Sequence, residues 1–524
     1  MVENQFDDEL TPTRKPSGFY GGLRLPTDKH DLADQPVLEA PLAEEYLLPL
    51  VQHRGLKARP VVAVGDKVLR NQLVAQPDGL ISAAIHAPTS GVVSSIERRP
   101  VSHISGLPGE CIILRSDGED QAVEPQPIEG DYHLIDPVRV RGRVREAGIV
   151  GLGGAVFPTS TKLTARADTF LHTLILNGAE CDPEIACDEV LMRIAPDAII
   201  EGARVVMHVL QVNRCVIGIE EDKPQCEQAL REAVERADDD RFEVVRVPAI
   251  YPEGSENQLI QALSGDEVPI GGLPLDIGYV CLNVATAASI NNAVHEGLPL
   301  TERLVTVTGT GLQGQANVRT RIGTPVSVLT ELVGGYTDDA ERLVIGGAMM
   351  GFAAQTDAIP VTKATNSILV MAPEQARGAE FVRPCIRCGE CARVCPSKLL
   401  PQQLYWHTVG GNEAQLERHN LMACIECGCC DYVCPSHIRL AEHFRYAKAT
   451  VAQRRIEREQ ARMAKVRFDR RNARLEQQQR ERVERIAEKK KTTARARAGD
   501  EKRQVIADVM RRVEEKESGG DESA

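Results

Sequence analysis

The sequence predicts a multidomain α/β protein that ends in a charged tail. Its 524 residues are enough for several domains, each with its own hydrophobic core. Between about residues 135 and 300, apolar strand-like runs alternate with runs of helical spacing, which is typical of a mostly parallel sheet covered by helices. Residues 450–524 contain 22 Lys and Arg against 15 Asp and Glu, so this end carries +7 while the rest of the chain carries −20.

The first segment, residues 1–120, is rich in Pro and Gly and contains short β-type runs at 59–76 and 85–97. This pattern resembles the barrel-sandwich hybrid of biotinyl and lipoyl domains. In those carriers a lysine stands at the hairpin tip between the two halves, whereas residues 77–80 here read Pro-Asp-Gly-Leu. We therefore expect a lipoyl-like barrel without an acceptor lysine, which has a structural role rather than a covalent carrier role.

An acidic, turn-rich linker at 118–131 separates this barrel from the α/β segment. Within the α/β segment, strands are expected at 173–180, 214–220 and 242–250, and helical runs at 184–210 and 223–237. Farther along, strand-like runs at 303–311 and 342–351 surround a helical stretch at 325–335. Residues 301–370 are therefore expected to form a small α+β module.

The composition excludes several other classes of protein. Hydrophobic residues make up 42% and charged residues 26%, a globular balance, and no stretch approaches the roughly 20 apolar residues that span a bilayer. The acidic first residues lack the regions of a signal peptide, so we expect the chain to stay on the cytoplasmic side, with membrane association through partners. Aromatic residues are only 4% and no recognition motif accompanies the basic tail, so no nucleic-acid partner is expected.

The tail, residues 450–524, is strongly helix-forming by propensity, but its apolar positions are sparse. It is expected to be a solvated helix or a disordered tail. The alternative is a helix that docks on a partner, either another protein of the same complex or an acidic membrane surface.

Fifteen cysteines are present, and eight of them form two runs of the type Cys-x2-Cys-x2-Cys-x3-Cys-Pro. The runs comprise Cys385, Cys388, Cys391 and Cys395, and then Cys424, Cys427, Cys430 and Cys434. Such close spacing favours metal binding in a reducing compartment over a disulfide framework. The others are interpreted mostly as small buried apolar residues, namely Cys111, Cys181, Cys187, Cys215, Cys226, Cys281 and Cys429.

The spacing of the two runs is that of bacterial two-cluster ferredoxins, in which the fourth cysteine of each run ligates the other cluster. One [4Fe–4S] cluster is therefore assigned to Cys385, Cys388, Cys391 and Cys434, and the second to Cys424, Cys427, Cys430 and Cys395. A pair of zinc sites is the alternative, but zinc usually takes two short cysteine pairs rather than triplets. Helix-like stretches between the runs favour an α-helical two-cluster ferredoxin domain over residues 375–445.

A glycine-dense loop at residues 151–162 reads Gly-Leu-Gly-Gly-Ala-Val-Phe-Pro-Thr-Ser-Thr-Lys. Glycines let backbone N–H groups approach a phosphate, and the lysine adds positive charge, although the loop matches neither a P-loop nor G-x-G-x-x-G. Taken alone, a plain turn is an equal alternative. Polar turns at 177–183, 251–256 and 282–286 each end an apolar run, where α/β sheets place ligands. The four segments together predict one pocket at one sheet edge.

In the same order, these four segments resemble the FMN- and NADH-binding segments of the flavoprotein subunit of respiratory complex I. With the N-terminal barrel and two ferredoxin motifs added, residues 15–445 resemble the RnfC family, the C component of the Rnf (Rsx) ion-translocating electron transport complex. The resemblance implies a Rossmann-like FMN/NADH domain over 135–300 and a β-grasp (SLBB-like) module over 301–370. It does not cover the tail.

The resemblance also implies roles for single residues. The glycine loop would line the flavin phosphate and ring through Gly151, Gly153, Gly154 and Lys162. Further FMN contacts would come from Asn177, Asn283 and Thr286, while NADH would be held by Glu180, Asp182 and Glu256, with Gly254 in the same turn. Three positions depart from the complex I pattern: Leu152 replaces an arginine, Ala179 an aspartate and Ser255 a glutamate. No side chain is expected to act as a catalytic acid or base.

As a whole, the resemblance implies an NADH-linked oxidoreductase subunit of the ferredoxin:NAD⁺ type, peripheral on the cytoplasmic face of the bacterial inner membrane. Expected cofactors are two [4Fe–4S] clusters and non-covalent FMN, with NAD(H) as the substrate. Expected partners are Rnf subunits of the B, D, G, A and E type and a ferredoxin-like protein. Two alternatives stay open: an electron relay with a vestigial nucleotide pocket, and the diaphorase module of a soluble hydrogenase or formate dehydrogenase.

Overall fold

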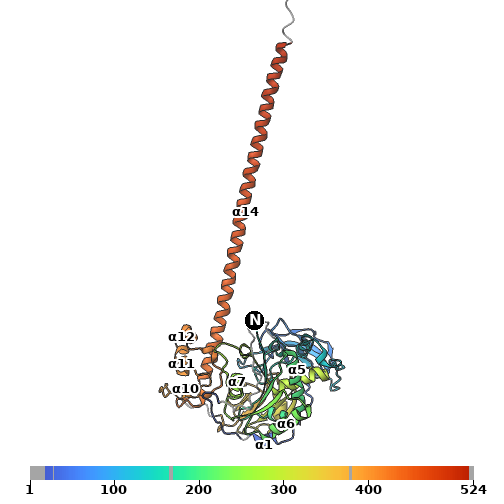
Figure 1. Ribbon diagram of the computed structural model, residues 1–524, viewed down its shortest axis with the longest axis vertical. Helices are drawn as coiled ribbons and strands as arrows, with labels where there is room; N and C mark the ends of the chain where they lie inside the picture. Colours follow the sequence, from blue (N-terminus) through green and yellow to red (C-terminus); the bar gives the residue numbers. More distant parts are fainter. Residues whose placement is uncertain (1–17, 28, 165–168, 377–380, 518–524) are drawn as a thin grey trace, which may run out of the picture. The chain divides into compact units, whose positions relative to one another are not determined.

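The structure, a computed structural model, describes residues 18–27, 29–164, 169–376 and 381–517. The chain divides into two compact units, residues 1–445 and 446–524. Among the described residues, the first unit contains four sheets and a helical region, and the second is helical (Figure 1).

Two small antiparallel sheets form the N-terminal barrel. One has the order β2-β8-β7-β4, with β2 Glu45–Pro49, β8 Gly109–Ser116, β7 Gly91–Arg99 and β4 Lys67–Val68. The other has the order β3-β5-β6, with β3 Arg59–Pro60, β5 Leu73–Gln76 and β6 Ile85–His86. Tyr46, Val74 and Ile112 lie in a single apolar core that both sheets share. The tip at 77–80 joins β5 to β6, as expected, and contains no lysine.

The central domain is built on a wholly parallel sheet of order β11-β10-β9-β12. Its strands are β9 Thr173–Gly178, β10 Cys215–Glu220, β11 Phe242–Val247 and β12 Tyr279–Asn283. Its main helices are α2 Pro137–Glu146, α3 Thr159–Lys162, α4 Cys187–Ile194, α5 Pro196–Leu210, α6 Pro224–Ala237, α7 Glu256–Ser264 and α8 Val284–Asn291. The parallel sheet expected from the alternation of strand-like and helical runs is thus present.

Helices cover both faces of this sheet because successive strand residues alternate between two cores. Leu174 and Leu176 of β9 pack in the core that contains α5 and α8, whereas Ile175 packs in the core that contains α7. Helices α5 and α8 approach closely at Gly202, where an added Cβ would lie 1.8 Å from the Ala287 carbonyl oxygen. A glycine is therefore required at that crossing.

The helical run expected at 184–210 is wrong in one respect, because it is two helices. Helix α4 ends at Ile194 and α5 begins at Pro196. Proline has no N–H to donate and its ring clashes with the preceding turn, so it fits at the first position of a helix but not in the interior.

The third module contains a six-stranded sheet of order β1-β14-β13-β17-β15-β16 and the helix α9 Val326–Leu332. The strands are β13 Glu302–Thr308, β14 Ala316–Arg321, β15 Arg342–Ile345, β16 Phe352–Ala353 and β17 Ser367–Met371. The edge strand β1, Leu38–Glu39, comes from the N-terminal segment and pairs with β14 in parallel. Strands β1, β14, β16 and β17 were not expected from the sequence.

Helices dominate the cysteine-rich region, as expected. They are α10 Glu390–Arg393, α11 Pro401–Val409, α12 Glu413–Arg418 and α13 Cys429–Tyr432. One helix, α14, then runs from Leu440 to Glu517 and includes the described part of the tail. Nearly all its side chains from residue 452 onward are exposed, which fits the solvated helix expected for the tail. Among the described residues, no helix is long and apolar enough to cross a membrane.

Candidate functional site

The centre of the site is the junction of strands β9 and β12. The chain runs from β9 outward to β10 and β11, then returns to form β12 on the other side of β9, so the strand order reverses between β9 and β12. Asn177 and Asn283 are register partners at the carboxyl ends of these two strands. Open α/β sheets bind ligands at such a switch point, outside the carboxyl ends of the strands.

The glycine loop lies against this junction. The N–H of Leu152 donates to Oγ1 of Thr286 at 2.9 Å, and a Cβ built on Gly153 would lie 3.4 Å from Cβ of Asn283. Thr286 itself is buried at the first turn of α8. The structure therefore brings together the glycine loop and the end of β12, as the sequence predicted.

The glycine loop fits a phosphate-bearing ligand. Gly153, Gly154 and Ala155 are exposed, and within the described parts of the chain no group accepts a hydrogen bond from their N–H groups. An added Cβ would meet only ordinary contacts at Gly151 and Gly153 and nothing within 4 Å at Gly154. The surrounding protein therefore has space for a larger side chain at all three positions, and the glycines leave this space open for a ligand. Consecutive free N–H groups form an anion-binding concavity.

Two asparagines fix the turns around the junction. The side chain of Asn283 caps α8 by accepting from the N–H groups of Ala285 and Thr286, at 3.0 and 3.3 Å, and its Nδ2 donates to Asp188 at 2.5 Å. The side chain of Asn177 donates to the Gly254 carbonyl at 2.8 Å. Gly254 is required there by packing, because an added Cβ would lie 2.4 Å from the Ala179 carbonyl oxygen.

Glu180 is buried and faces the start of α4. Its two carboxylate oxygens accept from the N–H groups of Asp188 and Glu189 at 2.9 and 3.0 Å. These N–H groups lie in the first turn of α4, where the helix dipole favours a negative charge. The structure thus gives Glu180 a capping contact that the sequence reasoning did not predict.

Asp182 lies beside the third module. Its Oδ1 accepts from the N–H of Glu184 at 3.2 Å, and a Cβ built on Gly347 would lie 2.1 Å from its carboxylate carbon. Burial raises the pKa of Asp182, although backbone hydrogen bonds, including those from Ala348 and Met349, act in the opposite direction. This carboxylate therefore joins the central domain to the segment after β15.

Lys162 and Glu256 form an ion pair at 2.6 Å, which joins the end of the glycine loop to the start of α7. Burial lowers the pKa of Lys162, but the charge and hydrogen bond of Glu256, together with the nearby Cys281, outweigh this effect and the net pKa is raised. The ammonium group therefore stays protonated and can contribute positive charge to the site.

The three departures from the complex I pattern have a simple structural setting. The side chains of Leu152 and Ala179 are buried in the two apolar cores of the central domain. Ser255 precedes the first residue of α7 and its side chain makes no capping hydrogen bond. Two of the three substituted side chains thus point into the protein rather than toward the open side of the loop.

Sequence reasoning missed four buried basic side chains that support the site. Lys29 donates to the carbonyl oxygens of Glu180 and Asp182, and Lys223 donates to that of Glu180 at 3.1 Å. Arg303 donates to the Leu152 carbonyl at 3.0 Å, and Lys363 donates to the Gly148 carbonyl at 2.6 Å just before the loop. Lys29, Arg303 and Lys363 come from outside the central domain, so no local pattern could have indicated them.

Glu253 predicts a specific dependence of stability on pH. Burial, with a contribution from Glu220, raises the pKa of Glu253 to about 8, and no described group hydrogen-bonds its Oε1. Because the folded pKa lies above the unfolded value of about 4.3, the folded state holds this proton more tightly, and stability falls as pH rises from about 4.3 to about 8 and then levels off. Glu253→Gln should flatten this fall, measured as melting temperatures at pH 6 and pH 9. Glu232→Gln, at an exposed position of α6, is the control and should leave the pH profile unchanged.

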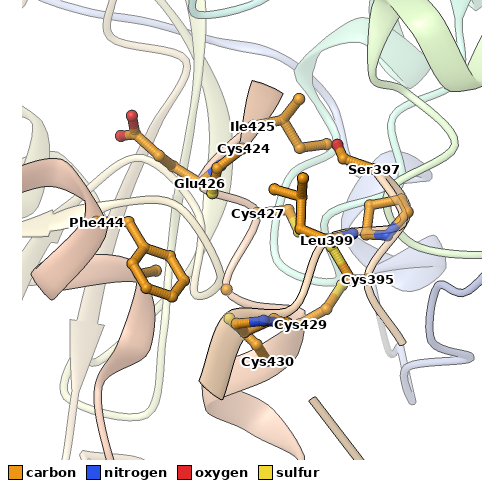
Figure 2. A pocket seen from close by; sticks show the side chains of 14 residues that line it. Cys395, Ser397, Leu399, Cys424, Ile425, Glu426, Cys427, Cys429, Cys430 and Phe444 are labelled. Carbon is orange, nitrogen blue, oxygen red and sulfur yellow. Dashed lines mark hydrogen bonds between the residues drawn. The ribbon is translucent and has the colours of Figure 1, made fainter. Parts of the chain in front are cut away.

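Five cysteines line one pocket of the helical region (Figure 2): Cys395, Cys424, Cys427, Cys429 and Cys430. The N–H groups of Leu399 and Glu426 donate to the sulfurs of Cys395 and Cys424, both at 3.4 Å. Such N–H···S bonds stabilise thiolates and influence the potential of an iron–sulfur cluster. The structure thus brings Cys395 of the first run to the three leading cysteines of the second run, and this donor set suits a cluster.

The other three cysteines of the two runs, Cys385, Cys388 and Cys434, lie near Cys391. Burial raises the pKa of Cys391, and the nearby thiols of Cys388, Cys385 and Cys434 add to the rise. The backbones of the two runs meet here, because Arg383 N–H donates to the Ser436 carbonyl at 2.9 Å. Each group of cysteines therefore combines three from one run with the last cysteine of the other run.

The two cysteine runs repeat the same backbone conformation at an offset of 39 residues, from Cys385 to Cys424. Arg387 and Glu426 both have φ of +59°, and Gly389 and Gly428 have φ of +83° and +76°. Cys429 takes the position that Glu390 occupies in the first run, the first residue of a short helix. It is therefore outside the repeated cysteine pattern. The interpretation of the scattered cysteines as buried is confirmed for six of them, while Cys181 is half-buried.

Tyr251 joins the two sites. Its hydroxyl donates to the carbonyl oxygen of Cys427 at 2.7 Å, and its ring packs in one apolar cluster with Cys427 and Cys429. Tyr251 lies three residues before Gly254, in the turn that Asn177 holds. The contacts of Tyr251 and its turn thus link the pocket that contains Cys427 to the strand-end junction.

Four protein-family models match consecutive parts of the chain. They are the RnfC barrel sandwich hybrid domain at 17–119, the Nuo51 FMN-binding domain at 144–292, the SLBB domain at 304–353 and the 4Fe-4S dicluster domain at 384–438. The expected barrel-sandwich, flavin, β-grasp and two-cluster ferredoxin architecture is confirmed, as are FMN and iron–sulfur clusters as the expected cofactor classes.

Curated relatives match over most of the chain, and each is described as the C component of an ion-translocating oxidoreductase complex. The protein from Pseudomonas aeruginosa is 45% identical over 87% of this chain and 58% of its own length. That from Vibrio cholerae is 42% identical over 89% and 60%, and that from Salmonella gallinarum is 40% identical over 95% and 73%. The chain thus spans about three-fifths of the length of the first two. A solved chain of an NAD⁺-reducing [NiFe]-hydrogenase is 19% identical over 60% of this chain and 62% of its own length, with a TM-score of 0.44, a similarity too weak to interpret.

Two findings establish the family of this chain. It is 40% identical to one relative over 95% of this chain and 73% of the relative, and four family models match it in consecutive order. The chain belongs to the RnfC family, the C component of the ion-translocating oxidoreductase (Rnf) complex.

Proposed function

We propose that the chain is the NADH-interacting flavo-iron–sulfur subunit of a membrane-bound Rnf-type complex. It passes electrons between NAD(H), FMN, two [4Fe–4S] clusters and partner subunits, as part of ferredoxin:NAD coupling. The observation that supports this most is that one turn contacts both places: Gly254 accepts from Asn177 at the strand junction, and Tyr251 donates to Cys427 in the cysteine pocket.

In this proposal the N–H groups of Gly153, Gly154 and Ala155 bind the FMN phosphate, and Lys162 supplies positive charge. Asn177, Asn283 and Thr286 shape the rest of the flavin site by fixing the turns at the ends of β9 and β12. FMN, when bound, supplies the ability to accept two electrons and release one at a time. Glu180, Asp182 and Glu256 position NADH, in part through the turns that they hold.

The cluster ligands are proposed as two crossed sets. The first set is Cys385, Cys388, Cys391 and Cys434, and the second is Cys424, Cys427, Cys430 and Cys395. The grouping of Cys395 with the second run in one pocket supports this assignment, as does the contact between Arg383 and Ser436. Cys429 remains a buried free thiol in this scheme.

We further propose that the protein is peripheral on the cytoplasmic face of the bacterial inner membrane, held there by its partners. Those partners are the Rnf subunits of the B, D, G, A and E type and a ferredoxin-like protein. The family membership and the two-cluster domain support this assembly over a soluble hydrogenase or formate dehydrogenase module.

The proposed activity is tested with purified full-length chain, NADH and ferricyanide. Ferricyanide reduction should disappear when FMN is removed and return when FMN is added back, because the flavin is the entry point for the hydride. A chain with full FMN and iron content that does not oxidise NADH would contradict the proposal and favour the relay with a vestigial pocket.

The tail is expected to serve assembly rather than electron transfer. Residues 454–497 contain 17 Lys and Arg against 7 Asp and Glu, and their helix is exposed, which suits an acidic protein or lipid surface. Deleting residues 455–524 should lower the share of this protein recovered with the membrane complex severalfold, while NADH–ferricyanide activity stays unchanged.

A matched variant separates charge from apolar contact in the tail. Near the end of α14, five exposed apolar side chains lie at helical spacing, namely Val505, Ile506, Val509, Met510 and Val513. Serine at these five positions should weaken membrane recovery less than the deletion does if the basic segment provides the attraction. Loss of flavin chemistry in the deletion variant would contradict the assembly role.

A further inference from the structure

The two cysteine runs share one backbone conformation but have different surroundings. Cys427 and Gly428 are buried, and a Cβ added to Gly428 would lie 2.8 Å from the Met349 carbonyl oxygen. The equivalent residues of the first run are open, since Cys388 is exposed and a Cβ added to Gly389 would meet nothing within 4 Å. The first run therefore presents the face that the rest of the protein covers in the second run.

The apolar residues between the first two cysteines show the same contrast. Ile425 packs in the cluster that contains Tyr251, Leu23 and Met349. Its equivalent Ile386 is 67% exposed. Phe381 and Val382, just before the first run, are 90% and 63% exposed. Three large apolar side chains thus lie uncovered beside an exposed cysteine, at a place where the repeated motif has a covered counterpart.

The charges on this face are basic in an otherwise acidic body. Residues 381–398 contain four Arg and Lys and one Glu, whereas residues 1–449 together carry −20. Arg393 and Lys398 have acidic partners at 2.8 and 2.6 Å. For Arg383 and Arg387, no carboxylate partner occurs among the residues that the structure describes, whereas the equivalent Glu426 is paired with Arg445 at 3.0 Å.

We propose that Phe381, Val382 and Ile386, with Arg383 and Arg387, form a docking surface for an acidic iron–sulfur carrier protein of the ferredoxin class. The apolar centre and basic surround match a small acidic partner, and charge complementarity speeds such encounters. The exposed Cys388 places the first cluster site at this surface, which short-range electron exchange requires. One electron leaves the cluster of the carrier and one enters a cluster of this chain, or the reverse, with no proton transferred. The inference rests on the proposed function and specifies where the partner binds.

In this proposal the two cluster sites have different neighbours. The site of Cys395, Cys424, Cys427 and Cys430 adjoins the flavin domain through Tyr251. The site of Cys385, Cys388, Cys391 and Cys434 exchanges electrons with the partner.

The test mixes oxidised full-length chain, loaded with clusters, with a reduced two-[4Fe–4S] bacterial ferredoxin in an anaerobic stopped-flow instrument. Phe381→Ser with Arg383→Glu lies outside the cysteine motif. Arg387→Glu introduces the residue that the second run already has on the same backbone. Each variant should lower the second-order rate of cluster reduction about tenfold or more, as expected for central interface residues, and should weaken its dependence on salt.

Matched controls are Phe170→Ser and Arg139→Glu, at exposed positions of the central domain, and both should keep the original rate. Reduction by dithionite and the EPR spectra of the clusters should be the same in all proteins. Unchanged ferredoxin rates in both surface variants, or an equal loss in the controls, would overturn the proposal. Because electrons enter from ferredoxin and are read at the clusters, the result does not depend on NADH or FMN and is separate from the test of the proposed function.

Discussion

Replacing both Gly153 and Gly154 by aspartate is expected to remove FMN from the purified chain while iron content stays unchanged. The two carboxylates would occupy the space that the glycines leave open and would repel a phosphate from the free N–H groups. With the anion site lost, flavin content should fall from about one per chain to near zero, because charge-assisted N–H bonds are the strongest contacts that the loop offers. Flavin absorbance after gel filtration measures the result.

Two controls separate charge from backbone strain. Gly154 has φ of +97°, so any side chain is strained there, whereas Gly153 lies outside the left-handed region and Gly153→Asp tests charge alone. Gly142→Asp on α2 adds the same charge where an added Cβ meets nothing within 4 Å, and it should retain full flavin. Undiminished flavin in the double variant would show that FMN binds elsewhere.

Replacing Cys427 by alanine is expected to abolish one of the two clusters. Iron should fall from about eight to about four atoms per chain, because a [4Fe–4S] cluster needs four cysteine ligands and Cys427 is proposed as one of them. EPR of the reduced protein should lose one signal. The remaining signal should come from the site that contains Cys391.

Cys429→Ala is the matched control, because this thiol is also buried, lines the same pocket and lies two residues away. It should keep about eight iron atoms and both EPR signals, since it lies outside the repeated pattern. Equal iron loss in the two variants would contradict the ligand assignment and give Cys429 a role in the cluster.

The features that could be predicted from sequence are those with a local signal. Strands and helices of the central domain follow from the periodicity of runs such as 173–180 and 223–237, and their alternation gives the parallel sheet. The break between α4 and α5 at Pro196 also has a local signal, since proline is excluded from the interior of a helix. The strand β1 was not, because two residues carry no period and their pairing with β14 joins segments about 280 residues apart.

In the candidate site, too, some residues have a local sequence signal and others do not. The glycine loop and the strand-end asparagines were found because their residue types and positions are themselves the signal. The capping contact of Glu180 depends on where α4 begins, and the support from Arg303 and Lys363 comes from a different module. Such long-range contacts leave no trace in spacing or composition. The difference between Ile386 and Ile425 is likewise invisible in two nearly identical motifs, because burial is decided by what packs against them.

The most direct test of the account is an anaerobic titration of the purified full-length chain with NADH, followed by visible absorbance and low-temperature EPR. We expect NADH to bleach the flavin absorbance and then to produce cluster signals, because the turn that contains Tyr251 contacts both the proposed flavin site and the pocket of Cys427. Clusters that dithionite reduces but NADH does not would contradict the account, and electrons would then have to enter the chain from a neighbouring protein.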